Sequence, residues 1–278
     1  MFSNRKLVIA TKHNKEQVIT PLLNKYLNIQ KVVTTNFDTD TLGTFAGEIT
    51  RIDDPISTVR IKCILAMQEA NCDLGIANEG SFGSHPTLFF CPADEEFMIF
   101  IDRKNKLEII ERIISTETNF LAKEITTESE LDTFLQQVQF PSHGVILRKS
   151  KDEKIEIFKN LQDEELVKEI FNLLIKKYQK AYIETDMRAM YNPTRMKVIE
   201  QVSEKLMHKI LSKCPTCSTP GYSVTNAKEG LPCMQCSLPT KSTLSYIYSC
   251  AHCSFTEEKK YPNNKELEDP MYCDYCNP

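Results

Sequence analysis

The chain ends in four Cys-x-x-Cys pairs: Cys214-Pro215-Thr216-Cys217, Cys233-Met234-Gln235-Cys236, Cys250-Ala251-His252-Cys253 and Cys273-Asp274-Tyr275-Cys276. The two-residue gap lets both thiolates of one pair face a single metal ion at about 2.3 Å. One tetrahedral zinc ion takes two such pairs, so the four pairs predict two zinc ions. Soft thiolates also suit iron–sulfur clusters, but separated pairs of this spacing favour zinc.

The segments between the pairs predict a zinc-ribbon-like module. A short strand is expected at residues 221–225, and strand-like runs at 243–249 and 254–261 flank the third pair. This layout favours an interleaved arrangement, in which the first pair joins the third and the second joins the fourth. A sequential arrangement fits the spacing nearly as well, so both remain open at this point.

The role expected for this zinc is structural. The segment has few large apolar side chains, and a short chain without a sufficient core needs a metal or a comparable staple. Residues 184–278 contain eleven Lys or Arg and eleven Asp or Glu. Each Zn(Cys)₄ site adds a formal charge of about −2, which argues against a nucleic-acid-binding ribbon. Docking of a protein partner is the functional alternative.

Composition places the whole chain among ordinary globular proteins. Of its 278 residues, 41% are hydrophobic and 26% are charged, and the formal net charge is −4. No apolar run approaches the roughly 18 residues that a membrane span requires, and the first residues fit a strand better than a secretory signal. Clustered Cys-x-x-Cys pairs fit metal binding in a reducing compartment. We therefore expect a cytoplasmic protein without a membrane partner.

The remainder of the chain predicts an α/β fold with a mixed sheet flanked by helices. Strands are expected at 6–11, 30–35, 73–77, 96–102, 107–116, 144–148 and 154–158, and helices at 14–26, 55–70, 128–138, 163–182 and 193–212. The order strand-helix-strand, followed by a hairpin, favours a mixed sheet over an all-parallel one. We expect an α/β domain over 1–183, a helical connector over 184–213 and the zinc module over 214–278.

The end of the first strand predicts a phosphate site. Thr11, Lys12, His13 and Lys15 lie between this strand and the next helix. A helix N-terminus offers free N–H groups and partial positive charge, and the lysines and the hydroxyl add further partners for phosphate. The simpler interpretation is that Thr11 or Asn14 caps the helix and that the lysines are solvated.

Two further clusters are candidates for the same site. Glu79 lies in a glycine-rich stretch, residues 78–83, where a carboxylate could hold Mg²⁺ together with phosphate oxygens and water. Arg188 and Arg195 could clamp a phosphate, and Asp186 could hold a metal or position Arg188. The simpler interpretations are an ordinary turn with an exposed Glu79, and a helix cap with a surface ion pair.

Part of the chain resembles a known enzyme family. Leu7-Val8-Ile9-Ala10-Thr11, the helix Val59–Ala66 and Asp73–Gly80 are similar to the inosine/xanthosine triphosphatases over roughly residues 6–85. This resemblance implies Mg²⁺-dependent hydrolysis of a nucleoside triphosphate to a monophosphate and pyrophosphate. The loop before Lys15 is one residue shorter than in that family, and the segment 44–48 also departs from its pattern.

The whole chain resembles an uncharacterised bacterial family, a domain of unknown function. Motifs that carry this resemblance include residues 10–13, 78–83, 115–120, 185–189, 192–196, 230–233 and 273–278. It implies the two-part architecture but no activity. The function that we expect is a Mg²⁺-dependent phosphohydrolase acting on a nucleoside triphosphate, with Glu79, Lys15 and Lys12 as catalytic residues. The alternatives are a nucleotide- or metabolite-binding protein without turnover, and a nucleic-acid-binding zinc ribbon.

Overall fold

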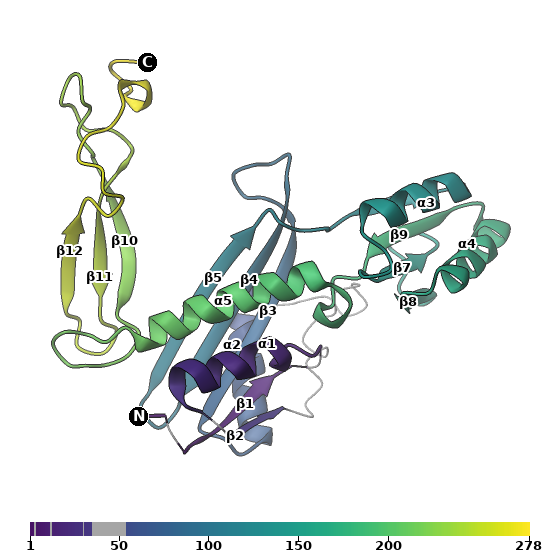
Figure 1. Cartoon of the computed structure of the whole chain (residues 1–278), viewed down its shortest axis with the longest axis horizontal. Helices are drawn as coiled ribbons and strands as arrows, with labels where there is room; N and C mark the ends of the chain where they lie inside the picture. The colour runs from purple at the N-terminus through teal and green to yellow at the C-terminus, as the bar shows by residue number, and fades with distance from the viewer. Residues whose placement is uncertain (3, 12, 30, 35–53) are drawn as a thin grey trace. The chain divides into compact units, whose positions relative to one another are not determined.

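The computed structural model describes residues 1–278 except 3, 12, 30 and 35–53. The chain forms two compact units, Met1–Met207 and His208–Pro278 (Figure 1). The segment 184–213, expected as a connector, therefore contributes its residues up to 207 to the first unit. In the part of the chain described here, no helix combines the length and the apolarity that crossing a bilayer requires.

A mixed five-stranded sheet forms the centre of the first unit, in the order β2-β1-β3-β4-β5. The strands are β1 Lys6–Ala10, β2 Lys31–Thr34, β3 Leu74–Ser84, β4 Pro92–Asp102 and β5 Leu107–Ser115. β1 runs parallel to β2 and β3, whereas β3, β4 and β5 are antiparallel neighbours. The expected mixed α/β sheet is confirmed. β1 ends at Ala10, which lies opposite Ala77 in β3, so the loop that follows β1 begins beside the second half of β3.

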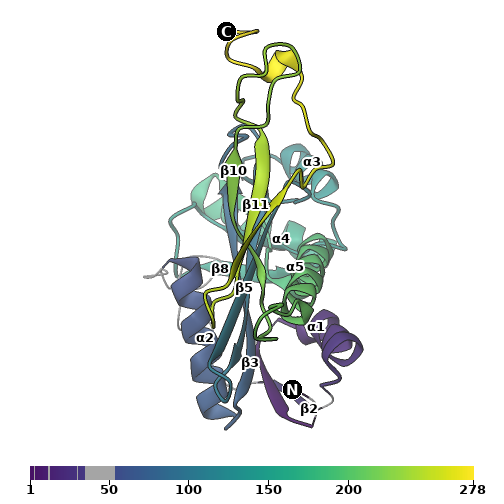
Figure 2. The same ribbon diagram turned by 90° about the vertical axis from the view of Figure 1, so that its left-hand side faces the viewer.

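Helices cover both faces of this sheet (Figure 2). Helix α2, Pro55–Glu69, packs on one face, where Val8, Cys63 and Ile99 belong to its buried core. Helices α1, Glu16–Leu22, and α5, Pro193–Leu211, lie on the other. Asp54 fixes the start of α2, because its side chain accepts hydrogen bonds from the N–H groups of residues 56 and 57.

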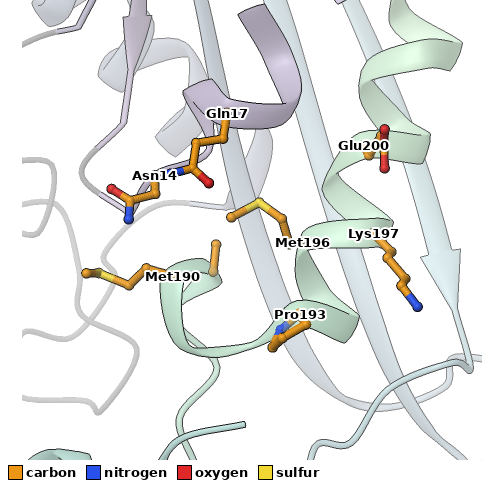
Figure 3. A pocket seen from close by; sticks show the side chains of 8 residues that line it. Asn14, Gln17, Met190, Pro193, Met196, Lys197 and Glu200 are labelled. Carbon is orange, nitrogen blue, oxygen red and sulfur yellow. The ribbon is translucent and has the colours of Figure 1, made fainter. Parts of the chain in front are cut away.

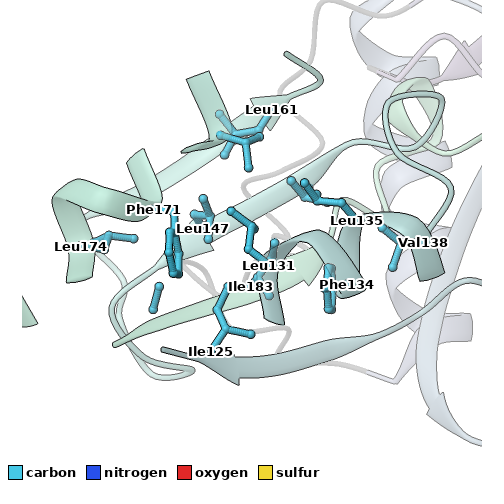
Figure 4. Packing of buried hydrophobic residues seen from close by; sticks show 13 residues of the cluster. Ile125, Leu131, Phe134, Leu135, Val138, Leu147, Leu161, Phe171, Leu174 and Ile183 are labelled. Carbon is cyan, nitrogen blue, oxygen red and sulfur yellow. The ribbon is translucent and has the colours of Figure 1, made fainter. Parts of the chain in front are cut away.

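A smaller antiparallel sheet completes the first unit, in the order β6-β9-β7-β8. Its elements are β6 Ala122–Ile125, α3 Glu128–Gln137, β7 Val145–Arg148, β8 Ile157–Leu161, α4 Glu164–Tyr178 and β9 Ala181–Thr185. Side chains from both helices pack on one face of this sheet and bury Phe134, Phe171, Leu147 and Ile183 (Figure 4).

The second unit is a three-stranded antiparallel sheet with cysteine pairs beyond its strands. The strands are β10 Ser223–Glu229, β11 Thr243–Ser249 and β12 Thr256–Lys260, in that order across the sheet. Its small core joins Tyr222, Tyr248 and Phe255, with Tyr222 ring centroids 5.6 Å and 6.1 Å from the other two. So few apolar side chains leave most of the unit's cohesion to other interactions.

Two expectations on secondary structure are wrong. The glycine-rich stretch 78–83 is not a turn but the second half of β3, which pairs with β4 along its whole length. The helix expected to reach residue 182 ends at Tyr178, because Gln179 adopts a left-handed conformation with φ 61°. The next residues enter β9, whose pairing with β6 and β7 outweighs the local helical pattern.

Candidate functional site

Charged side chains converge where β1 ends beside the middle of β3. The loop that follows β1 carries Thr11, His13 and Lys15 into helix α1, while Asn78 and Glu79 follow the apolar half of β3. Thr11, Lys15, Asn78 and Glu79 are all buried. Lys12 lies outside the described residues.

A continuous relay of hydrogen bonds links α1, β3, β4 and α5. Lys15 Nζ donates to Asn78 Oδ1 at 2.8 Å, and Asn78 Nδ2 donates to Glu96 Oε2 at 2.8 Å. Arg195 Nε donates to the other oxygen of Glu96 at 2.7 Å. Arg195 also donates through Nη1 to the carbonyl of Met187 at 2.5 Å. All four relay side chains are buried, so each polar group is satisfied inside the protein rather than by bulk water.

Gly80 makes room for this relay. A Cβ built on Gly80 would lie 2.7 Å from Glu96 Oε1 and would also collide with Arg195 Nη2. The Arg195 guanidinium further lies over the Phe82 ring, with its central carbon 4.9 Å from the ring centroid. Gly80 of β3 thus serves close packing of charged side chains rather than a turn.

Glu79 has a partner inside the protein. Lys62 of α2 forms an ion pair with Glu79 Oε2, and both side chains are buried. In the described part of the chain, the only groups of three or more side chains suited to holding a metal are the cysteine clusters. An Mg²⁺ ion at Glu79 would therefore need phosphate oxygens and water for its other ligands.

Asp186 forms an ion pair with Arg188. It is fully buried just after β9 and accepts hydrogen bonds from Arg188 Nε at 2.9 Å and from the Arg188 backbone N–H at 3.1 Å. Arg188 also bonds Asn160, and its guanidinium lies over the Tyr191 ring. Of the two roles considered for Asp186, the structure places it against the arginine.

The electrostatic environment of the loop after β1 is strongly cationic. Burial first, and then the neighbouring charge of Arg195, lower the pKa of Lys15 to about 7. Burial, followed by the charges of Lys15, Arg195, Arg188 and Lys62, lowers the pKa of His13 to about 3. His13 is thus neutral at physiological pH, and these four side chains lie close enough to affect its charge.

Asp94 is a second unusual group, on the same face of β4 as Glu96. Its side chain is wholly buried, and no donor among the described residues reaches either of its oxygens. Burial and the negative charge of Glu96 raise the pKa of Asp94 to about 8. Burial opposes the ionisation of Glu96 as well, yet Arg195 and Lys15 hold its pKa below the ordinary value. Asp94 is therefore mainly protonated at neutral pH, with Glu96 beside it as an acceptor.

The eight cysteines of the second unit form two clusters. Cys214 and Cys217 meet Cys250 and Cys253, and Cys233 and Cys236 meet Cys273 and Cys276, which confirms the interleaved arrangement. Facing sulfur atoms lie 3.6–3.8 Å apart. Zinc–sulfur bonds of about 2.3 Å place the sulfurs of a tetrahedral site about 3.8 Å apart. Each cluster thus has the geometry to hold one metal ion, consistent with zinc.

The first three pairs share one turn. The serine that follows each pair is left-handed, with φ 59° at Ser218, 61° at Ser237 and 58° at Ser254. Its N–H donates to the carbonyl of the first cysteine of the pair at 2.9–3.0 Å. This turn curls each pair so that both sulfurs face the same point.

Several residues of the site carry no signal in the sequence. In the sequence, Lys62 is one polar residue of a predicted helix, and Asp94 and Glu96 are acidic residues in and beside a predicted strand. Asp94 and Glu96 are two residues apart in β4, and alternate residues of a strand face the same side of the sheet. This spacing, among apolar neighbours, is the signal that could have indicated an inward-facing pair.

A mixed α/β unit with a buried cationic site, followed by a unit with two cysteine clusters, defines the class of this protein. The chain belongs to the family described as domain of unknown function DUF6671, whose model matches residues 62–278. A comparison with curated proteins finds no match. The matched range covers both cysteine clusters, Glu96 and Arg195, and begins after the loop that carries Lys15. These comparisons lend no support to the resemblance of residues 6–85 to the inosine/xanthosine triphosphatases.

Proposed function

We propose that the first unit binds the phosphate groups of a small molecule at the cations between α1, β3 and α5. Lys15 carries this proposal. Its ammonium group is buried, yet the hydrogen-bond partner of that group is the neutral amide of Asn78. A buried cation is costly unless a negative charge compensates it. A bound phosphate would supply that charge through short, charge-assisted hydrogen bonds.

The balance of charge around Lys15 supports the same proposal. Among the described residues, Lys62 pairs with Glu79, Arg188 with Asp186 and Arg195 with Glu96. Asp94 is mainly protonated at neutral pH and adds little negative charge. Of these four cations, Lys15 is the one without an ion pair among the described residues, so the site favours an anion.

Titration calorimetry of the full chain with inorganic triphosphate tests this proposal. We expect binding to take up protons between pH 7 and 8, because the anion raises the pKa of Lys15 above about 7. Repeating the titration in buffers of different ionisation enthalpy counts these protons. Lys15→Met should weaken binding by at least about tenfold, a loss typical of one charge-assisted contact. Lys176→Met, at an exposed lysine of α4, should change nothing. Absence of binding, or equal binding by Lys15→Met, would contradict the proposal.

The reaction that we propose for this site is Mg²⁺-dependent hydrolysis of a nucleoside triphosphate. Lys15 and Arg195 would stabilise charge that develops on the phosphate oxygens, and Glu79 would hold the metal once Lys62 yields one carboxylate oxygen. The alternative, binding without turnover, is favoured by the Lys62–Glu79 ion pair in the ligand-free protein. Phosphate and pyrophosphate release from canonical and deaminated nucleoside triphosphates separates the two. Turnover that is lost in Glu79→Gln supports hydrolysis, whereas tight binding without release supports the alternative.

We propose zinc as the metal of both cysteine clusters, with a structural role. All four positions around each ion are taken by thiolates, which is typical of structural rather than catalytic zinc. Metal analysis of the purified chain should find two zinc ions, and iron in their place would overturn the assignment. Docking of a protein partner by this unit stays a prediction, and the unit exposes Met234, Met271 and Tyr275 near its second cluster.

A further inference from the structure

A pocket lies between the start of α1 and the start of α5. Its volume is about 280 Å³, and its walls include Asn14, Gln17, Met190, Pro193 and Met196. Figure 3 shows the side chains of Gln17 and Met196 directed toward the same space, with Asn14 and Met190 beside it. Lys197 and Glu200 of α5 also line the pocket, and in Figure 3 the ammonium end of Lys197 points away from Gln17 and Met196.

The pocket adjoins the cationic site through the backbone. Asn14 stands between His13 and Lys15, and Met196 follows Arg195 directly. Consecutive Cα atoms are 3.8 Å apart, so two residues of the pocket wall are backbone neighbours of Lys15 and Arg195. Asn14 is left-handed, with φ 58°, a conformation that asparagine tolerates better than most residues. This turn lets Lys15 reach inward to Asn78 while Asn14 lines the pocket.

The chemistry of the walls selects a class of ligand. Met190, Met196 and the Pro193 ring offer an apolar surface, and methionine sulfur makes favourable contacts with aromatic rings. Asn14 and Gln17 add amide donors and acceptors on the opposite side, which suit a hydrogen-bonding ring edge. An aliphatic chain would leave these amides unused, and a bare sugar would gain little from the two thioethers.

We propose that this pocket holds the nucleobase of a nucleotide whose phosphates lie against Lys15 and Arg195. This assignment rests on the proposed phosphate binding and adds the part of the ligand that the cations do not touch. Met190 and Met196 pack against the ring, and Asn14 and Gln17 bond to its edge. The four residues therefore set the specificity for the base.

The test compares nucleoside triphosphates with inorganic triphosphate, which has the phosphates but no ring. Binding of ATP, GTP, CTP, UTP and ITP to the full chain is measured beside inorganic triphosphate at one ionic strength. We expect at least one nucleotide to bind about tenfold or more tightly than inorganic triphosphate, the gain of a well-placed ring. The double variant Gln17→Ala and Met190→Ala should lose most of this gain and keep its affinity for inorganic triphosphate.

The variants are chosen so that a change in binding is not caused by a loss of folding. Gln17 and Met190 are exposed, so their truncation spares the core. Met271→Ala, at an exposed methionine of the second unit, is the matched control and should bind every ligand as the wild type does. If inorganic triphosphate binds and no nucleotide binds more tightly, the pocket assignment is wrong while phosphate binding stands. An equal loss for both ligands in the double variant also overturns it. If nothing binds, phosphate binding fails and the pocket assignment fails with it.

Discussion

Replacement of Lys15 by methionine should make the first unit more stable while it weakens phosphate binding. Lys15 is buried, and its pKa is lowered from 10.5 to about 7. One pKa unit corresponds to about 1.4 kcal/mol, so keeping this ammonium group in the folded protein costs at most about 5 kcal/mol below pH 7. Methionine has a similar length and no charge, so the variant avoids this cost.

A second effect partly offsets the gain. The bond from Lys15 Nζ to Asn78 Oδ1 is lost, and the amide oxygen is left without that donor at a cost of about 1–3 kcal/mol. The net expectation is a free energy of unfolding higher by about 2 kcal/mol at pH 6.5. For a unit of this size, such a change raises the midpoint of thermal unfolding by about 4–8 °C.

The difference should depend on pH with a definite sign. Between pH 7 and 10.5 the unfolded chain keeps the Lys15 proton that the folded chain has released. The stability of the wild type therefore rises with pH in this window, and the advantage of the variant fades. Below pH 7 both states of the wild type hold the proton, so the advantage is constant.

Calorimetric unfolding at pH 6.5 and pH 9.5, without phosphate, checks this expectation. The transition of the first unit is the one that a chelator leaves in place, because both cysteine clusters lie in the second unit. Lys176→Met serves as the control at an exposed lysine. A Lys15→Met variant that is less stable at pH 6.5, or whose advantage is the same at both pH values, refutes the reasoning.

Three other variants test the relay, the buried acid and the metal clusters. Gly80→Ala should lower the free energy of unfolding by about 1–3 kcal/mol and weaken triphosphate binding, because the new Cβ would enter the space of the Arg195–Glu96 pair. Gly83→Ala is the control: its Cβ would meet nothing among the described residues, so chemical denaturation and binding should both be unchanged. The free energy of unfolding of Asp94→Asn should rise relative to that of the wild type as the pH increases from 5 to 8. The reason is that Asp94 holds its proton to about pH 8 in the folded protein but releases it near pH 3.8 in the unfolded chain. A difference in urea unfolding that does not change with pH would argue against a protonated Asp94. Cys236→Ser should reduce the metal content from two ions per chain to about one in elemental analysis, with Cys91→Ser as control; two ions retained in the Cys236 variant would mean that this thiolate is dispensable.

The metal clusters show what local spacing can predict and what it cannot. Two cysteines separated by two residues meet one ion whatever the rest of the chain does, so the eight ligands are evident from the sequence. Their partners are up to 43 residues away, as for Cys233 and Cys276. The expected strands around the third pair favoured the correct arrangement, because a ribbon brings alternate pairs together. The tertiary structure was needed to exclude the sequential one.

The residues that mark the start of a helix are also a local signal in the sequence. Asp54 before Pro55, and Thr127 three residues before Glu130, mark α2 and α3 because their side chains bond the first free N–H groups of each helix. The glycine-rich stretch 78–83 misled for the opposite reason. Gly80 in this stretch allows a close approach of Arg195, 115 residues further along the chain, and no local pattern shows a contact of that range.

The sequence by itself determined the eight cysteine ligands, the mixed α/β class and the cationic loop after the first strand, because each follows from residue patterns within single segments and from their order along the chain. Only the tertiary structure joined Lys15, Asn78, Glu96 and Arg195 into one relay and paired Lys62 with Glu79. These contacts depend on strand register and on which helix covers which face of the sheet. Both follow from the burial of apolar side chains over the whole unit, which no single segment specifies.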